Sequence, residues 1–154
     1  ITFSNNKNLF TIGHGPQGGD ELNIITEGSH YGHPVMTFGV SYGEKEYMHY
    51  NDQNFKAFRP PIYSFSPSVA PSDILFNKSY KPLGNTSDCE FVLTTLKQES
   101  LVFMRLNNGC SNVQNIELLD LDRRLRKIAS DGKEVPTFAF TSDNENLIGL
   151  LKLN

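Results

Sequence analysis

The sequence predicts an all-β fold assembled from repeated four-stranded antiparallel sheets, on three observations. The 154 residues include 11 Phe and 6 Tyr beside 12 Gly and 8 Pro, and aromatic residues between frequent turn residues favour strands over helices. A pattern of two strands joined by a short turn occurs three times along the chain. Further short strand candidates lie before or after each copy, as expected for sheets of four strands.

The repeat is clearest in two segments of equal length, 91–107 and 138–154, whose starts are about 47 residues apart, a spacing typical of propeller blades. Each segment predicts a strand, a polar turn and a second strand that ends in Leu-Asn. A third copy at 10–26 has a glycine-rich loop in place of the turn. The connection that follows it, 27–60, is rich in Gly, Tyr, His and Asn, and we expect a long surface loop there.

Other short strands complete the units. They are expected at 72–76 and 125–129, before the two later hairpins, and at 62–65 and 113–119, as outer strands. Units of 40–50 residues with four short strands are the signature of β-propeller blades. Within 117–129 the leucines also fit a helical stripe, but the repeat favours a strand.

Counting hairpins gives two complete blades and most of a third. Propellers close with roughly four to eight blades, so we expect residues 1–154 to be the C-terminal part of a larger propeller whose first blades are absent. The first residue, Ile1, agrees with a start partway through a longer product.

Charge and cysteine content restrict the function classes. With 14 Lys and Arg against 17 Asp and Glu, the chain has no basic surplus for binding nucleic acid. It has no apolar run near the roughly 18 residues of a membrane-spanning helix. Cys89 and Cys110 flank one predicted hairpin, so a disulfide in an oxidising compartment and two separate thiols are both compatible with the sequence.

The densest group of chemically capable residues is the glycine-rich loop 14–21. Glycines allow the backbone to approach a guest closely, and the adjacent Asp20 and Glu21 offer the hard oxygen ligands that Ca²⁺ prefers. The alternative is a tight hairpin loop with a solvated acidic tip. His14 belongs to this loop, and no histidine has an evident Ser or Cys partner for hydrolytic catalysis.

A second group is cationic. Alternation along a strand puts Arg124 and Arg126 on one face, where two guanidinium groups suit the capture of carboxylates. Lys97 lies in a hairpin turn. The alternative for the arginines is a solvated charged edge strand, and for Lys97 simple exposure.

Five motifs in order resemble the soluble quinoprotein glucose/sorbosone dehydrogenases, from about residue 8 to 154. They are HGPQGGDELNII, GSHYGHPV, PSVAPSDILF, LTTLKQESLVFMRL and RRLRKIASDG. The resemblance implies a six-bladed propeller that uses pyrroloquinoline quinone (PQQ) and calcium to oxidise an aldose or oligosaccharide substrate at C1, passing electrons to an external acceptor. It also implies a periplasmic or secreted protein, with a homodimer as one arrangement.

The resemblance assigns residues as well. It implies that the backbone carbonyls of Gly15 and Pro16 bind the calcium that contacts the quinone. Glu21 and Tyr31 match a second, structural calcium site. Lys97, Arg124 and Arg126 match the residues that hold the carboxylates of the cofactor.

The resemblance leaves the catalytic residue outside the chain. The histidine base of the family is expected upstream, so no residue here is assigned to catalysis. Ser66 stands where glucose-oxidising members place an aromatic residue that stacks on the quinone, and Gln98 stands where a basic residue or Gly is common. The alternative function is a non-enzymatic, calcium-stabilised propeller that serves as a carbohydrate- or protein-binding module.

Overall fold

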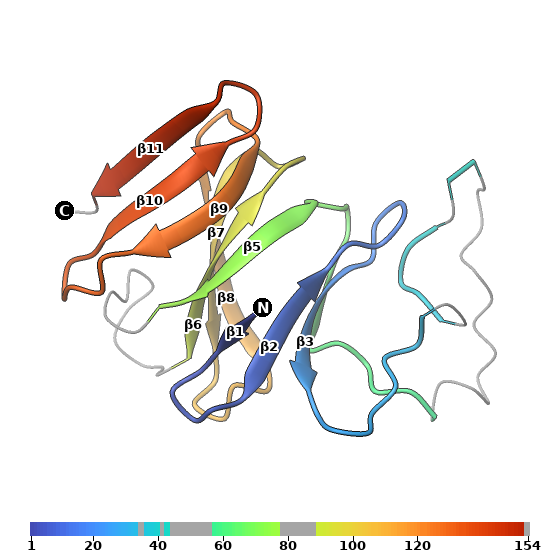
Figure 1. The fold of residues 1–154 in the computed structure, drawn as a ribbon. Coiled ribbons are helices and arrows are strands. Elements are labelled where there is room, and N and C mark those ends of the chain that lie inside the picture. Colours follow the sequence, from blue (N-terminus) through green and yellow to red (C-terminus); the bar gives the residue numbers. More distant parts are fainter. Residues whose placement is uncertain (34–35, 41, 44–56, 78–88, 153–154) are drawn as a thin grey trace.

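The computed structural model describes residues 1–33, 36–40, 42–43, 57–77 and 89–152. Within these residues there are no helices, and the strands form three antiparallel sheets that lie side by side (Figure 1). No described segment therefore meets the length and apolarity of a membrane-crossing helix. The predicted all-β, propeller-like class is confirmed.

The first two sheets each have four strands, in sequential order. The first contains β1 (Thr2–Phe3), β2 (Leu9–Gly13), β3 (Asp20–Ile25) and β4 (Tyr63–Phe65). The second contains β5 (Pro71–Phe76), β6 (Glu90–Thr95), β7 (Ser100–Leu106) and β8 (Val113–Asp120). The third sheet has three strands, β9 (Leu125–Ser130), β10 (Thr137–Ser142) and β11 (Leu147–Lys152). Two full blades and most of a third are the number that the repeat predicts.

The three copies of the repeat are the hairpins β2–β3, β6–β7 and β10–β11. Each copy begins with a phenylalanine, and the burial of this residue explains why the pattern recurs. Phe10, Phe91 and Phe138 are each fully buried, because each places its ring between neighbouring sheets. The ring centroids of Phe10 and Phe91 are 4.6 Å apart, and those of Phe103 and Phe138 are 6.2 Å apart.

The middle sheet is covered on both faces. Successive residues of a strand point to opposite sides, so Phe91 and Leu93 enter the cluster shared with the first sheet, whereas Val92 enters the cluster shared with the third. All of β6 is consequently buried. This explains why its sequence is a continuous apolar run rather than an alternating one.

The strand interpretation of 117–129 is confirmed, and the helical stripe is wrong. The segment forms the end of β8, a turn that contains Leu121, and the start of β9. Leu119, Leu121 and Leu125 meet at the cluster between the second and third sheets. The expected surface loop 27–60 falls partly outside the described residues, which leave out 34–35, 41 and 44–56. Its described part is not wholly on the surface, since Met36 is buried and Val40 forms an isolated bridge with Gln17.

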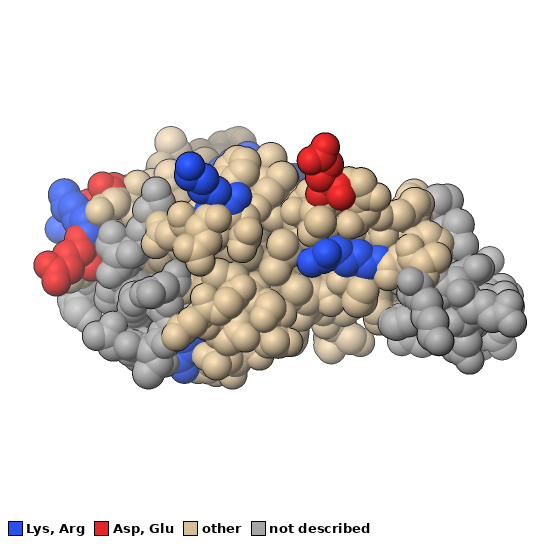
Figure 2. Space-filling model, turned by 90° about the horizontal axis from the view of Figure 1, so that it is seen from below, with Lys and Arg blue, Asp and Glu red and all other residues tan. Residues whose placement is uncertain are grey.

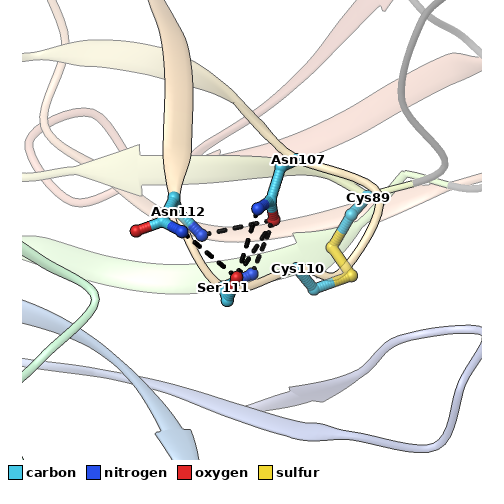
Figure 3. The surroundings of a disulfide bond; sticks show 5 residues. All are labelled: Cys89, Asn107, Cys110, Ser111 and Asn112. Atoms are coloured by element: carbon cyan, nitrogen blue, oxygen red, sulfur yellow. Dashed lines mark hydrogen bonds between the residues drawn. A yellow bond between two sulfur atoms is a disulfide. The ribbon is translucent and has the colours of Figure 1, made fainter.

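The two cysteines, which the sequence left open, are bonded to each other. Cys89 directly precedes β6 and Cys110 lies in the β7–β8 turn, with their Cα atoms 5.6 Å apart. Asn107 orders this turn, since its Oδ1 accepts hydrogen bonds from the backbone N–H groups of Ser111 and Asn112 (Figure 3). The disulfide therefore fixes the open end of the central hairpin of the middle blade.

Candidate functional site

The glycine-rich loop 14–19 connects β2 to β3, and its close packing requires glycine. A Cβ atom on Gly15 would overlap the carbonyl of Gly18, and one on Gly19 would overlap the backbone of Phe38 and Gly39. Gly19 also has a φ of +70°, a conformation that side chains disfavour. The loop is thus a compact backbone structure.

Asp20 anchors this loop to the next sheet. Its side chain is buried, and its Oδ1 accepts a hydrogen bond of 2.9 Å from the backbone N–H of Gly15. Its Oδ2 accepts three more, from the Ser68 hydroxyl at 2.7 Å and from the N–H groups of Val69 and Ala70 at 2.8 Å. The sequence suggested Asp20 as a metal ligand, but its carboxylate is occupied by these four donors and holds the loop in place.

Lys97 is positioned by the same segment. The N–H of Leu96 donates to the carbonyl of Ala70 at 2.9 Å, and the N–H of Lys97 donates to the carbonyl of Val69 at 3.1 Å. The β6–β7 turn is therefore bonded to the two residues whose N–H groups Asp20 binds. One continuous set of hydrogen bonds runs from the loop at Gly15, through Asp20, to the turn that carries Lys97.

These elements enclose a cavity of about 560 Å³ at the loop end of the blades, within the size range of small-molecule sites. Three of the residues expected to bind cofactor or metal meet there, namely Gly15, Pro16 and Lys97. The rest of the lining is mostly polar or small, apart from the aromatic Tyr42, and it includes Ser66, where the sequence lacks an aromatic residue. We name this space the loop cavity.

His14 also lines the loop cavity, but its ring is engaged. Its Nε2 lies 2.6 Å from the carbonyl oxygen of Pro71. A carbonyl oxygen only accepts hydrogen bonds, so Nε2 carries the proton and donates it. This interaction connects the His14 ring to the start of β5.

Arg124 and Arg126 lie on one side, as the alternation predicts, and both contact Asp143. The shortest atom pairs are 3.6 Å from Arg124 Nη2 to Asp143 Oδ2 and 3.1 Å from Arg126 Nε to Asp143 Oδ1. The hydrogen bond from Arg126, followed by the charges of both arginines, lowers the pKa of Asp143. Arg124 Nη1 lies 3.4 Å from the carbonyl of Leu96, which places this guanidinium beside the turn of Lys97.

Glu21 and the Tyr31 hydroxyl lie at opposite ends of β3. Glu21 is opposite Gly13 and Ser64 near the start of the strand. The Tyr31 hydroxyl is at the far end, where it donates to the carbonyl of Ile24 at 2.8 Å and accepts from the N–H of Thr26 at 2.7 Å. Burial raises the pKa of Glu21, and a hydrogen bond from Asn23 partly offsets this rise.

Asp143 was missed by the sequence reasoning, as was the anchoring role of Asp20. No local pattern marks either residue, because their distant partners come from segments 17 to 50 residues away.

The described residues contain no group of three or more His, Cys, Asp or Glu side chains able to hold a metal. A metal in the loop cavity would therefore depend on backbone oxygens.

Side-by-side antiparallel sheets, with a cavity lined by Lys97 where their strand connections meet, define this chain as part of a β-propeller. The family model for glucose/sorbosone dehydrogenase matches residues 1–149. The chain therefore belongs to the glucose/sorbosone dehydrogenase family, as the ordered motifs indicated.

The relatives agree with this assignment. The aldose sugar dehydrogenase YliI of Escherichia coli is 28% identical over 116 residues, which cover 75% of this chain and 30% of the relative. The crystal structure of the soluble aldose sugar dehydrogenase from Escherichia coli in its apo-form is 25% identical, with a TM-score of 0.73 over 96% of this chain and 41% of its own. The chain thus spans well under half the length of these relatives.

The same fold occurs in an aldose sugar dehydrogenase from Streptomyces coelicolor, whose structure is described as the PQQ-bound form. It matches with a TM-score of 0.66 and 20% identity, over 97% of this chain and 40% of its own. At this identity the match speaks for the fold alone.

Proposed function

We propose that residues 1–154 are the C-terminal blades of a six-bladed propeller. The support comes from the third sheet, in which β11 is the edge strand of the described residues. Ile148 and Leu150 on one face of β11 are 72% and 73% exposed. Exposed apolar side chains of this kind mark a surface that another element covers, and the missing blades are its natural partner.

We propose that the whole protein oxidises an aldose sugar at C1 to a lactone, using PQQ and calcium, and passes the electrons to an external acceptor. The observation that carries this proposal is the loop cavity, where the Gly15–Pro16 backbone faces Lys97, with Arg124 adjacent. When bound, the quinone would supply the two-electron oxidant and calcium a Lewis acid.

The residues present fit such a cofactor. Gly15 and Pro16 both line the loop cavity, where their backbone carbonyl oxygens would be the kind of ligand that calcium takes. Lys97 at the cavity and Arg124 beside it supply positive charge for the carboxylates of PQQ. Asp143 holds the guanidinium groups of Arg124 and Arg126 in place and leaves other N–H groups of each free to donate.

No side chain that lines the loop cavity is suited to remove the proton from the sugar. His14 donates its proton to Pro71, Asp20 accepts four hydrogen bonds, and Lys97 is assigned to the carboxylates of the cofactor. The general base therefore comes, in this proposal, from the missing blades. The role of this chain is to bind and orient the cofactor.

Replacing Arg124 and Arg126 together by Gln tests the cofactor assignment. We expect the affinity for PQQ to fall by about 10- to 100-fold, because two charge-assisted hydrogen bonds are lost, while calcium affinity stays the same. Equilibrium dialysis with PQQ measures the first, and calorimetry with calcium the second. Arg123→Gln is the matched control, since Arg123 pairs with Glu145 away from the site. Equal losses for both ligands, or unchanged PQQ affinity, would remove the arginines from the site.

A second candidate function is a calcium-stabilised propeller that binds a carbohydrate or protein without redox chemistry. Two observations favour it. Asp143 already pairs with both arginines, and Ser66 offers no aromatic ring to the loop cavity. This candidate predicts calcium binding without PQQ binding.

We propose a periplasmic or secreted location. The Cys89–Cys110 disulfide supports it, because structural disulfides persist in oxidising compartments and are rare in reducing ones.

Figure 2, which views the molecule from below, shows that the described charged side chains on that face occur singly or in small groups, without a continuous basic surface.

A further inference from the structure

The face of the first sheet that carries Glu21 is more polar than a buried surface usually is. Leu22 and Ile24 on β3 point into the core between the first two sheets. The alternate residues Glu21 and Asn23 therefore share the opposite face. Asn23 on that face is 93% buried, being only 7% exposed.

Asn23 has a buried oxygen without a hydrogen-bond partner. Its Nδ2 donates to Glu21 Oε2 at 3.2 Å, whereas its Oδ1 receives no hydrogen bond. A buried acceptor left unpaired destabilises the fold unless something else binds it. The Asn23 amide is thus held by the Glu21 carboxylate through Nδ2, and its Oδ1 is still available as a ligand atom.

Glu21 also lacks a positive partner among the described residues. Its only described side-chain hydrogen bond comes from Asn23, and none of the described ion pairs includes it. A half-buried carboxylate without a cation is costly, because burial disfavours its charged form. A cation bound by oxygen ligands would satisfy both the Glu21 carboxylate and the free Oδ1 of Asn23.

The strand register adds two hydroxyl groups to this face. Thr11 on β2 is directly opposite Asn23, and Ser64 on β4 is directly opposite Glu21. Directly opposed residues of antiparallel strands point to the same face with their Cβ atoms about 5 Å apart. The described part of this face therefore presents carboxylate, amide and hydroxyl oxygens within two rungs of the sheet.

We propose that Asn23 is a calcium ligand, binding through Oδ1 the same ion as the Glu21 carboxylate. Oxygen donors alone, in a flexible arrangement, suit Ca²⁺ better than Zn²⁺, which takes His and Cys, or Mg²⁺, which demands near-octahedral geometry. A single carboxylate in the ligand set places the affinity on the order of 10⁻⁴ to 10⁻³ M. This inference rests on the second, structural calcium site that the family resemblance implies at Glu21, and it adds the residue that positions this site inside the sheet.

The test measures calcium affinity by calorimetry, together with the calcium-induced shift in Tm, on the quinone-free protein. The Glu21→Gln variant identifies the site at Glu21: the calcium binding and the calcium-induced Tm shift that this variant loses belong to that site. We expect Asn23→Ala to weaken that site at least about fivefold through the loss of one oxygen ligand. Asn23→Asp, which keeps an oxygen and adds charge, should melt lower than the wild type in chelator and gain a larger shift from calcium. Asn144→Ala, at an exposed turn residue, should match the wild type.

The outcomes separate the inference from the function it extends. If Asn23→Ala and Asn23→Asp keep the wild-type calcium shift while Glu21→Gln loses it, Asn23 is not a ligand and the inference is overturned. An equal loss of Tm for Asn23→Ala in calcium and in chelator overturns it as well, because the role would then be packing alone. If Glu21→Gln changes nothing, the calcium site that the resemblance implies at Glu21 does not exist and the inference is overturned with it, whereas the proposed calcium in the loop cavity is unaffected.

Discussion

Replacing Asp20 by Asn is expected to lower the free energy of unfolding by about 3 kcal/mol, since buried hydrogen bonds to a charged group are among the strongest. The amide presents one acceptor oxygen in place of two, so part of the set formed by Gly15, Ser68, Val69 and Ala70 loses its partner. Urea unfolding measures the change. Because these bonds connect the loop to the turn of Lys97, PQQ affinity should also decrease.

Two comparisons isolate this effect. Asp122→Asn changes an exposed aspartate and should unfold like the wild type. In a double-mutant cycle, Ser68→Ala should cost stability in the wild type and almost none beside Asp20→Asn, because the hydroxyl has then lost the carboxylate that it binds. Equal urea midpoints for Asp20→Asn and Asp122→Asn would contradict the anchoring role.

Replacing Cys89 and Cys110 by Ser is expected to lower the free energy of unfolding by about 3 kcal/mol. The bond closes a segment with a sequence separation of 21 residues, and opening a loop of this size returns that amount of conformational entropy to the unfolded chain. Urea unfolding again measures the effect. The loop cavity is at the other end of the blade, so PQQ affinity should change little.

A reducing agent provides the control for this prediction. Dithiothreitol should shift the wild type to the urea midpoint of the double serine variant and should leave that variant unchanged. A wild type that is insensitive to the reductant, with two thiols titratable under native conditions, would show that the cysteines are not bonded.

The sequence was sufficient for most of the fold because its repeat marks buried positions. The recurring Phe10, Phe91 and Phe138 each fill the space between two sheets, so the same local pattern had to appear in each blade. The repeat also favoured strands over a helix for 117–129, despite the helical spacing of its leucines. The short strand β1 was not predicted, because two residues are too few to show an alternation.

The site was less accessible from the sequence because it depends on contacts between distant segments. The anchoring role of Asp20 requires the N–H groups of Val69 and Ala70, about 50 residues away. The Asp143 carboxylate approaches Arg126 only because the β10–β11 turn packs beside β9. The motif resemblance named Gly15, Pro16 and Lys97, and the structure brings these three to one cavity, whereas it places Glu21 and the Tyr31 hydroxyl along different parts of β3.

The most direct test of the proposed dehydrogenase is dye reduction by the full-length protein with a panel of aldoses. The assay includes PQQ and calcium, with quinone-free and chelated controls. We predict sugar-dependent turnover that requires both additions and that falls strongly in the Arg124→Gln, Arg126→Gln double variant. No turnover with any aldose, in a folded protein whose Tm still rises with calcium, would contradict the dehydrogenase and leave the calcium-stabilised binding propeller.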